Sequence, residues 1–153
     1  GTTLNLGSKG GKIVAGLTVA GLIGIFAFVL YLMGMRFHFE LDAHKLDIQA
    51  GPYSYEILRE DIAELDYRTE QVEKIRLNGY GGQGKSFGIF RIEGYGVSRL
   101  YSYNSNDEHI AIRSISTGQW ILINLSEEED TRTFYQALED WLETGAMQSS
   151  TWE

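Results

Sequence analysis

The first long feature of the hydropathy pattern is an apolar run from Ile13 to Met33 that contains no charged residue. At a rise of about 1.5 Å per residue, an α-helix of this length covers the roughly 30 Å hydrocarbon core of a bilayer. Lys9 and Lys12 precede the run, and Tyr31 and Arg36 lie at its other end, as membrane interfaces favour. The pattern predicts a transmembrane helix over 13–33 in a single-pass protein of the cell membrane, with the lipid bilayer as its partner.

Two other interpretations of this run are a secretory signal peptide and the buried helix of a soluble protein. A signal peptide has a shorter apolar core and a small-residue cleavage pattern, whereas Met33 is followed by Gly-Met-Arg-Phe. A buried helix is usually shorter or carries a polar stripe, and here Thr18 is the one polar residue. Both interpretations fit the run less well than a spanning helix does.

Small side chains recur at every fourth position of this helix, at Gly16, Ala20 and Gly24. Such a stripe lets two membrane helices approach closely, so these residues are a candidate helix–helix contact and favour a homo-oligomer. The alternative is the ordinary enrichment of small residues in membrane helices.

The charges on the two sides of the run are balanced, because Lys9 and Lys12 precede it and Arg36 and Lys45 follow it. The positive-inside rule therefore assigns no side of the membrane to the rest of the chain. Residues 1–12 form an N-terminal flank. Because the chain starts with glycine and not methionine, we expect this flank to include an expression remnant, or the native sequence to extend upstream.

Beyond the run, apolar and polar residues alternate with a period of two, the pattern of half-buried strands. Three such segments, at 37–41, 46–48 and 53–57, predict a meander of short strands with turns between them. The next segment, 61–67, mixes helical and extended spacing. Residues 78–88 are dense in glycine and are expected to form a long loop.

Four more short apolar or alternating runs follow, at 87–93, 99–103, 110–115 and 120–125. Each is bounded by glycine, asparagine or serine, and their spacing is typical of successive antiparallel strands. The pattern therefore predicts a mainly β domain over 36–144.

One helix is predicted at the end of this domain, over 127–144. Ser126 and Glu129 have the spacing of a capping box, and Gly145 is a typical helix terminator. Its apolar residues fall on one face at helical spacing: Phe134, Leu138, Trp141 and Leu142. That face should pack on an open end of the β structure. Residues 145–153 show no periodic pattern and are predicted to be a frayed tail.

The formal net charge of −8 over 153 residues argues against nucleic acid as a partner, because binding phosphates needs a surplus of lysine and arginine. The charge is uneven, since six basic residues face four acidic ones between Val72 and Arg113. Cysteine is absent, which excludes disulfides, thiolate nucleophiles and cysteine-ligated zinc.

The segment Gly79–Ser86 matches the P-loop pattern G-x-x-x-x-G-K-[ST] letter for letter. A P-loop binds phosphate because a helix begins at its lysine, whereas Lys85 leads into the strand-like alternation of 87–93. Nucleotide binding is therefore a disfavoured alternative. The loop could still form an anion-binding nest of backbone N–H groups with nearby cations, using Arg76, Gly79, Gly81, Gly82, Gly84 and Lys85. The simpler interpretation is that these glycines relieve strain in a mobile loop.

No other group of residues indicates catalysis or a cofactor. His38, Glu40, Asp42 and His44 lie close together in the sequence and could form a metal site, but a solvated strand face explains them better. His109 is expected at the surface. No serine or threonine has a histidine and an acid at a diagnostic spacing. We expect no enzyme activity and no cofactor.

Several short motifs occur in a specific order along the β segment: Leu46-Asp47-Ile48 before Gly51-Pro52-Tyr53, Ile57 before Asp61-Ile62 and Leu65, Asn78-Gly79 before Gly88-Ile89-Phe90-Arg91, Leu100-Tyr101 before Ile110-Ala111-Ile112, and Trp120-Ile121-Leu122-Ile123 before the acidic helix. In this order they resemble the bacterial pleckstrin-homology-like (PH-like) domains, over about Arg36 to Thr144.

The resemblance implies a bent antiparallel sheet or partly open barrel of seven strands, with the terminal helix at one end. It also implies a non-catalytic role in protein association or envelope organisation, with a protein partner that the sequence does not name. Eukaryotic relatives bind phosphoinositides through a basic loop between their first two strands. Here that loop is 42–45, Asp-Ala-His-Lys, so no ligand residues are carried over.

Overall fold

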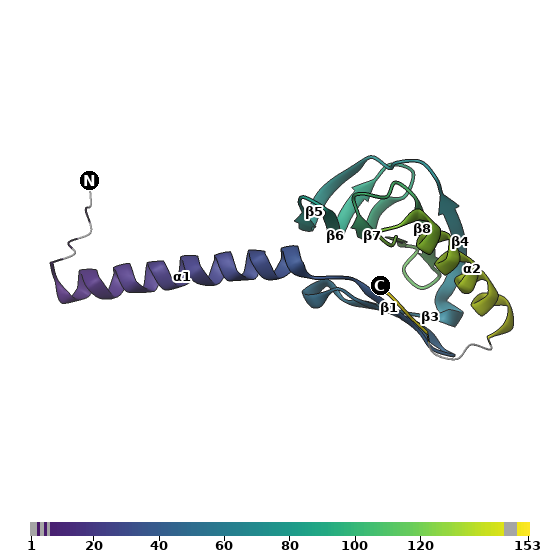
Figure 1. The fold of residues 1–153 in the computed structure, drawn as a ribbon, viewed down its shortest axis with the longest axis horizontal. Coiled ribbons are helices and arrows are strands. Elements are labelled where there is room, and N and C mark those ends of the chain that lie inside the picture. The colour runs from purple at the N-terminus through teal and green to yellow at the C-terminus, as the bar shows by residue number, and fades with distance from the viewer. Residues whose placement is uncertain (1–2, 4, 6, 146–149) are drawn as a thin grey trace. The chain divides into compact units, whose positions relative to one another are not determined.

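The computed structural model describes residues 3, 5, 7–145 and 150–153. The chain divides into two compact units, Gly1–Gly34 and Met35–Glu153. The first unit contains helix α1 (Lys9–Gly34), which begins where the Ser8 Oγ accepts a hydrogen bond of 2.9 Å from the Gly11 N–H. Figure 1 shows α1 as one continuous helix.

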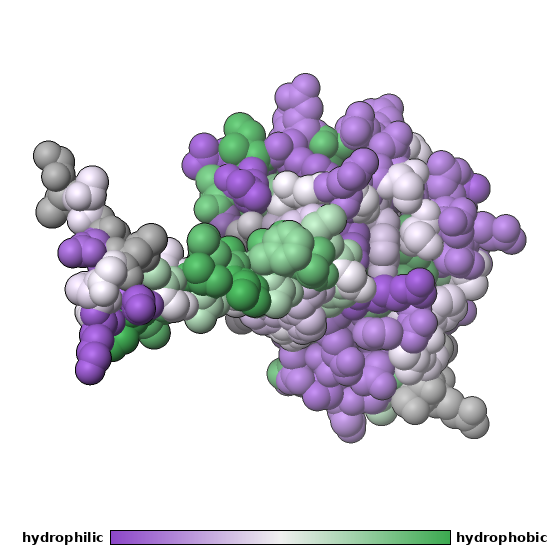
Figure 2. All heavy atoms as spheres, turned by 60° about the vertical axis from the view of Figure 1, so that its left-hand side comes forward, coloured by the Kyte–Doolittle hydropathy of each residue, from purple (hydrophilic) through white to green (hydrophobic). Residues whose placement is uncertain are grey.

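Helix α1 is long and apolar enough to cross a membrane. Its most apolar 18-residue window has a mean hydropathy of 2.6, and no residue of that window is buried. Thr18 satisfies its hydroxyl within the helix by donating to the Val14 carbonyl at 2.9 Å. Apolar side chains therefore face outward along nearly the whole helix, whereas Figure 2 shows mainly hydrophilic side chains on the visible surface of the second unit.

The second unit, hereafter the β domain, contains two sheets and one long helix. A four-stranded antiparallel sheet has the order β10-β1-β2-β3 and contains β1 (His38–Leu41), β2 (Lys45–Gln49), β3 (Tyr55–Leu58) and β10 (Ser150–Trp152). A six-stranded sheet has the order β4-β8-β9-β7-β6-β5 and contains β4 (Ile62–Arg68), β5 (Lys74–Gly81), β6 (Lys85–Ile92), β7 (Gly96–Tyr103), β8 (His109–Ser114) and β9 (Trp120–Ile123). The short helices η1 (Gly51–Tyr53) and η2 (Arg59–Asp61) flank β3, and α2 (Glu128–Thr144) follows β9.

An aromatic core joins the two sheets to α2. Phe37, which precedes β1, contacts the rings of Phe87 and Tyr101 with centroid distances of 5.7 and 6.0 Å. Phe39 contacts Phe134 of α2 at 5.5 Å. All five side chains are fully buried, so the predicted alternation of β1 places its apolar residues in the core.

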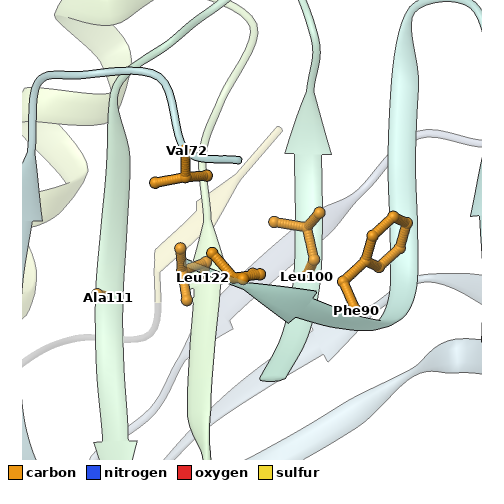
Figure 3. Packing of buried hydrophobic residues seen from close by; sticks show 6 residues of the cluster. Val72, Phe90, Leu100, Ala111 and Leu122 are labelled. Carbon is orange, nitrogen blue, oxygen red and sulfur yellow. The ribbon is translucent and has the colours of Figure 1, made fainter. Parts of the chain in front are cut away.

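A second apolar cluster lies on the opposite face of the six-stranded sheet. It consists of Val72, Phe90, Ile92, Leu100, Ala111 and Leu122. Figure 3 shows Val72, from the segment between β4 and β5, above Leu122, with Leu100 and Phe90 on the neighbouring strands. Because both faces of this sheet bury apolar side chains, its central strands read as apolar runs.

Helix α2 is fixed at both ends. Its N-cap is Glu127, which makes no side-chain capping bond, so the predicted capping box of Ser126 and Glu129 is wrong. Three acidic residues in the first turn instead stabilise this end of the helix, because their charges interact favourably with the helix dipole. Gly145 ends the helix with φ 63°, as predicted, and Arg59 donates from Nε to the Trp141 carbonyl at 2.8 Å.

A buried carboxylate also ties α2 to the six-stranded sheet. Glu108 accepts hydrogen bonds from Arg132 of α2 and from the Tyr67 hydroxyl of β4. The Arg132 guanidinium holds the pKa of Glu108 below its usual value. This arrangement satisfies a carboxylate that is only 5% exposed.

The predicted mainly β PH-like fold with a C-terminal helix is confirmed, with corrections in detail. Nine strands precede α2 where seven were expected, because 61–67 and much of 78–88 are extended. Only residues 82–84 separate β5 from β6, so the expected long glycine loop is wrong. Ser150–Trp152 forms β10, so this part of the predicted tail is ordered, while residues 146–149 lie outside the described part of the chain.

His109 is buried, which corrects its expected place at the surface. Its Nδ1 donates to the Asp107 carbonyl at 2.9 Å, and its Nε2 lies 2.8 Å from the Ser102 hydroxyl, which donates to it. Burial is the main cause that lowers the pKa of His109 to about 4.

The low pKa of His109 predicts acid sensitivity. Between the unfolded pKa of about 6.5 and the folded pKa of about 4, His109 binds a proton in the unfolded chain but not in the folded one. The contribution of His109 to stability is therefore fully present above pH 6.5 and is lost as the pH falls from 6.5 to 4. The expected loss is about 2–3 kcal/mol by pH 4. Denaturation of the full chain in detergent between pH 7 and 4 measures it. His109→Gln should flatten this dependence; an equally steep curve for the variant would assign the loss to other groups.

Candidate functional site

The glycines of 78–88 serve the close pairing of β5 with β6. Gly79 and Gly88 face each other in the ladder, with φ of 131° and 120°. A methyl group on Gly79 would collide with the Phe87 carbonyl, and one on Gly88 with the Asn78 carbonyl. Glycine is therefore needed here for close approach of two backbones.

Lys85 does not have the setting of a P-loop lysine. It begins strand β6, and its Nζ is buried and donates to the Met35 carbonyl. Burial and the charge of Arg36 lower its pKa. The strand context that disfavours nucleotide binding is therefore confirmed.

The structure also separates the two cations of the proposed anion loop. Arg76 pairs in register with Phe90, whereas Lys85 lies an odd number of residues from Phe90 on the same strand. Because side chains alternate between faces along a strand, Arg76 and Lys85 lie on opposite faces of the sheet. Gly82 and Gly84 lie in the short turn, and Gly81 lies under the Arg76 side chain, whose Cδ would be 3.6 Å from an added Cβ.

A row of exposed side chains, mostly apolar, crosses the sheet at the start of β5, the end of β6 and the start of β7. Arg91 of β6 pairs with Ile75 of β5 on one side and with Val97 of β7 on the other. Leu77 lies at the bulge of β5, two residues after Ile75. Ile75 is 63% exposed, and Leu77 and Val97 are each 47% exposed. We call Ile75, Leu77, Arg91, Val97 and Arg99 the β5–β7 surface.

An open pocket of about 700 Å³ adjoins this surface. Ile75 and Arg91 line it, together with the charged side chains of Glu73, Lys74 and Glu93. Its lining is therefore mixed, because the apolar side chains of Ile75 and Ile92 stand beside charged side chains of both signs.

Arg99 is held at the inner end of the β5–β7 surface. Its guanidinium lies 4.1 Å from the centroid of the Tyr55 ring, a cation–π contact between the two sheets. Its Nε is buried and has no hydrogen-bond partner among the described residues. Burial raises the pKa of neighbouring Tyr101 to about 12, and Tyr101 donates to the Tyr53 carbonyl at 2.6 Å.

The outer edge of β5 is protected against pairing with another strand. Its register shifts between Arg76 and Asn78, which is a bulge, and Lys74 stands at its start. Bulges and edge lysines are devices that oppose strand addition. The outer backbone edge of β5 is therefore poorly suited to the addition of another strand.

The comparisons with known proteins give one match. The sequence pattern of the family described as Bacterial PH domain matches residues 37–140. This chain belongs to the bacterial PH domain family. No curated protein and no solved structure matches it.

In this bacterial PH domain, the turn between β1 and β2 is held by hydrogen bonds within the turn. The Asp42 carboxylate accepts hydrogen bonds from the backbone N–H groups of His44 and Lys45, at 2.7 and 3.0 Å. These bonds, the His44 contact first, lower the pKa of Asp42. His38 lies 3.2 Å from Glu153, and Glu40 accepts from Gln49. Among the described residues, these side chains form no group of three that could hold a metal ion.

Sequence reasoning did not single out the β5–β7 surface. The sequence does show apolar residues of β5 that alternate with cations. Whether these apolar side chains are exposed depends on which strand lies at the edge of the sheet, and the sequence pattern does not give the strand order. Gly16, Ala20 and Gly24 lie on α1, where no side chain of the described residues lies near the two glycines. Their role in helix contacts stays a prediction.

Proposed function

We propose that this protein is a membrane-anchored, non-catalytic PH module that mediates protein association in the cell envelope. Helix α1 supplies the anchor, and the bacterial PH domain supplies the partner surface. Only Met35 and Arg36 separate the end of α1 from buried Phe37, where the family match begins. A spanning α1 would therefore keep the domain within reach of the lipid surface.

The observation that carries this proposal is the β5–β7 surface. Exposed, adjacent large apolar side chains such as Ile75, Leu77 and Val97 are typical of contact sites. Arg91 on β6 and Arg99 on β7 are neighbours of Val97 and favour a partner with acidic side chains. We infer that the partner offers a surface with both apolar and acidic residues.

The polar groups of the domain support a non-catalytic role. Ser102 and His109 form a serine–histidine hydrogen bond, but both side chains are buried. The His109 ring is held by its hydrogen bond to the Asp107 carbonyl. We assign this pair a structural role.

Photocrosslinking in native membranes tests the proposal. A photoreactive residue at Leu77 or Val97 of the full chain should yield a protein adduct, and one at exposed Glu129 of α2 should not. Ile75→Asp should reduce the adduct yield at Val97 at least fivefold, because it puts a charge into the apolar row. Equal yields at all positions, or yields that ignore Ile75→Asp, would contradict a specific contact.

Arg91 and Arg99 lie near each other on β6 and β7, which favours anionic lipid or phosphate as a second candidate ligand. The full chain in neutral nanodiscs would then capture phosphatidylserine vesicles in a salt-sensitive way, and the double variant Arg91→Gln/Arg99→Gln would not. Capture that is equal for phosphatidylcholine vesicles would exclude this ligand class.

A further inference from the structure

The open edge of β1 is covered by the last described residues of the chain. Strand β10 pairs antiparallel with β1 in the register Phe39↔Trp152, Glu40↔Thr151 and Leu41↔Ser150. The sheet order ends at β10, which therefore occupies the outer edge of β1.

Side chains of this C-terminal segment make two specific contacts. The Trp152 ring stacks on Phe134 of α2, with a centroid distance of 5.2 Å and an interplanar angle of 28°. The Glu153 carboxylate lies 3.2 Å from His38 Nδ1 at the start of β1. The segment therefore docks through an aromatic residue and the acidic residue that follows it.

The receiving surface belongs to the core of the domain. Phe134 and Phe39 contact each other at 5.5 Å and are fully buried in the presence of β10. Unpaired backbone groups at a sheet edge beside an aromatic side chain are what an extended peptide needs for strand addition. Unlike β5, strand β1 has no bulge in its register with β2 or β10.

The described contacts that attach β10 to the domain are few. The attachment consists of a three-residue strand, one ring stack and one histidine–carboxylate contact whose two side chains are 39% and 60% exposed. A polar contact between exposed side chains adds little to stability. A segment of this chemistry stays docked mainly because it belongs to the same chain and so has a high effective concentration.

We propose that the β1 edge and Phe134 form a strand-docking site for an extended segment of a partner protein in which an aromatic residue is followed by an acidic one. Residues 150–153 occupy this site as an internal competitor. The site is independent of the β5–β7 surface, because it lies on the other sheet. A partner binds when its own local concentration lets it displace β10.

The test uses the full chain in detergent and a fluorescent peptide that carries residues 150–153 between flexible flanks. A variant that lacks 150–153 should bind this peptide at least tenfold more tightly than the intact chain does. Ser150→Pro, which removes the backbone N–H that faces Leu41 of β1 in the β1–β10 register, should give the same gain if the deletion fails to fold.

Two matched changes test the side-chain contacts. Replacing the tryptophan of the peptide by alanine should lower its affinity at least tenfold, and His38→Gln in the receiving chain should lower it two- to threefold. Equal binding to the intact and deleted chains, equal binding of the alanine peptide, or no binding to either opened variant would each overturn the proposal. None of these outcomes depends on crosslinking at the β5–β7 surface.

Discussion

Gly79→Ala is expected to destabilise the β domain by about 3 kcal/mol or more. The residue has φ 131°, which alanine rarely adopts, and its new methyl group would collide with the Phe87 carbonyl across the β5–β6 ladder. Gly88→Ala should have an effect of the same size, because its methyl group would collide with the Asn78 carbonyl. Denaturant unfolding of the full chain in detergent, followed by near-ultraviolet circular dichroism, measures both.

Two other glycines of the same hairpin provide controls. Gly81→Ala should change the stability by less than about 0.5 kcal/mol, because the nearest neighbours of its Cβ would be at 3.6 Å or beyond. Gly84 has φ 86° with open space around it, so Gly84→Ala should cost about 1 kcal/mol for the backbone strain alone. If the four variants had similar stabilities, close approach of the strands would not be the reason for these glycines.

Trp141→Ala is expected to lower the free energy of unfolding by about 3–5 kcal/mol. The ring is fully buried between α2 and the four-stranded sheet, and its Nε1 donates to the Asp42 carbonyl at 2.7 Å. Alanine would leave a cavity and an unsatisfied carbonyl where the last turn of α2 is held. The same unfolding measurement applies.

Trp141→Phe separates the two contributions. It keeps most of the apolar volume but removes the hydrogen bond to Asp42, so the expected loss is about 1–2 kcal/mol. Leu142→Ala, at a half-buried neighbour on α2, should be milder than Trp141→Ala. A phenylalanine variant as unstable as the alanine variant would mean that the hydrogen bond dominates.

Local periodicity predicted the elements whose reason lies within a few residues. The period of two placed Phe37, Phe39 and Leu41 in the core, and the helical spacing of Phe134, Leu138 and Trp141 gave the buried face of α2. Gly145 ends α2 in the left-handed conformation that its position suggested. In each case the sequence neighbours alone determine which side chains share a face.

The errors arose where distant residues decide the structure. His109 is buried because Ser102 and Asp107 satisfy both of its ring nitrogens, which the polar character of histidine does not reveal. Strand β10 exists because Trp152 finds Phe134 and the free edge of β1. The glycines at 79 and 88 suggested a loop because their partners across the ladder were unknown.

The same reason explains why the β5–β7 surface was not predicted. Ile75 and Val97 have the pattern of core residues, but Ile75 is on β5, which ends the six-stranded sheet, and Val97 is at the start of β7, and both side chains are exposed. Lys85, by contrast, was a candidate for anion binding because of its neighbours in the sequence. Its amine is instead used within the fold, on the Met35 carbonyl.

The central claim is that α1 spans the membrane and anchors the bacterial PH domain. Because the chain has no cysteine, single cysteines at Thr3, Gly21 and Glu143 can report the side of the membrane through a membrane-impermeant maleimide. We expect one of Thr3→Cys and Glu143→Cys to react in intact spheroplasts, the other to react only after permeabilisation, and Gly21→Cys to react only after detergent. Reaction of Thr3→Cys and Glu143→Cys from the same side, or loss of the Thr3 label by cleavage of the chain, would contradict the claim.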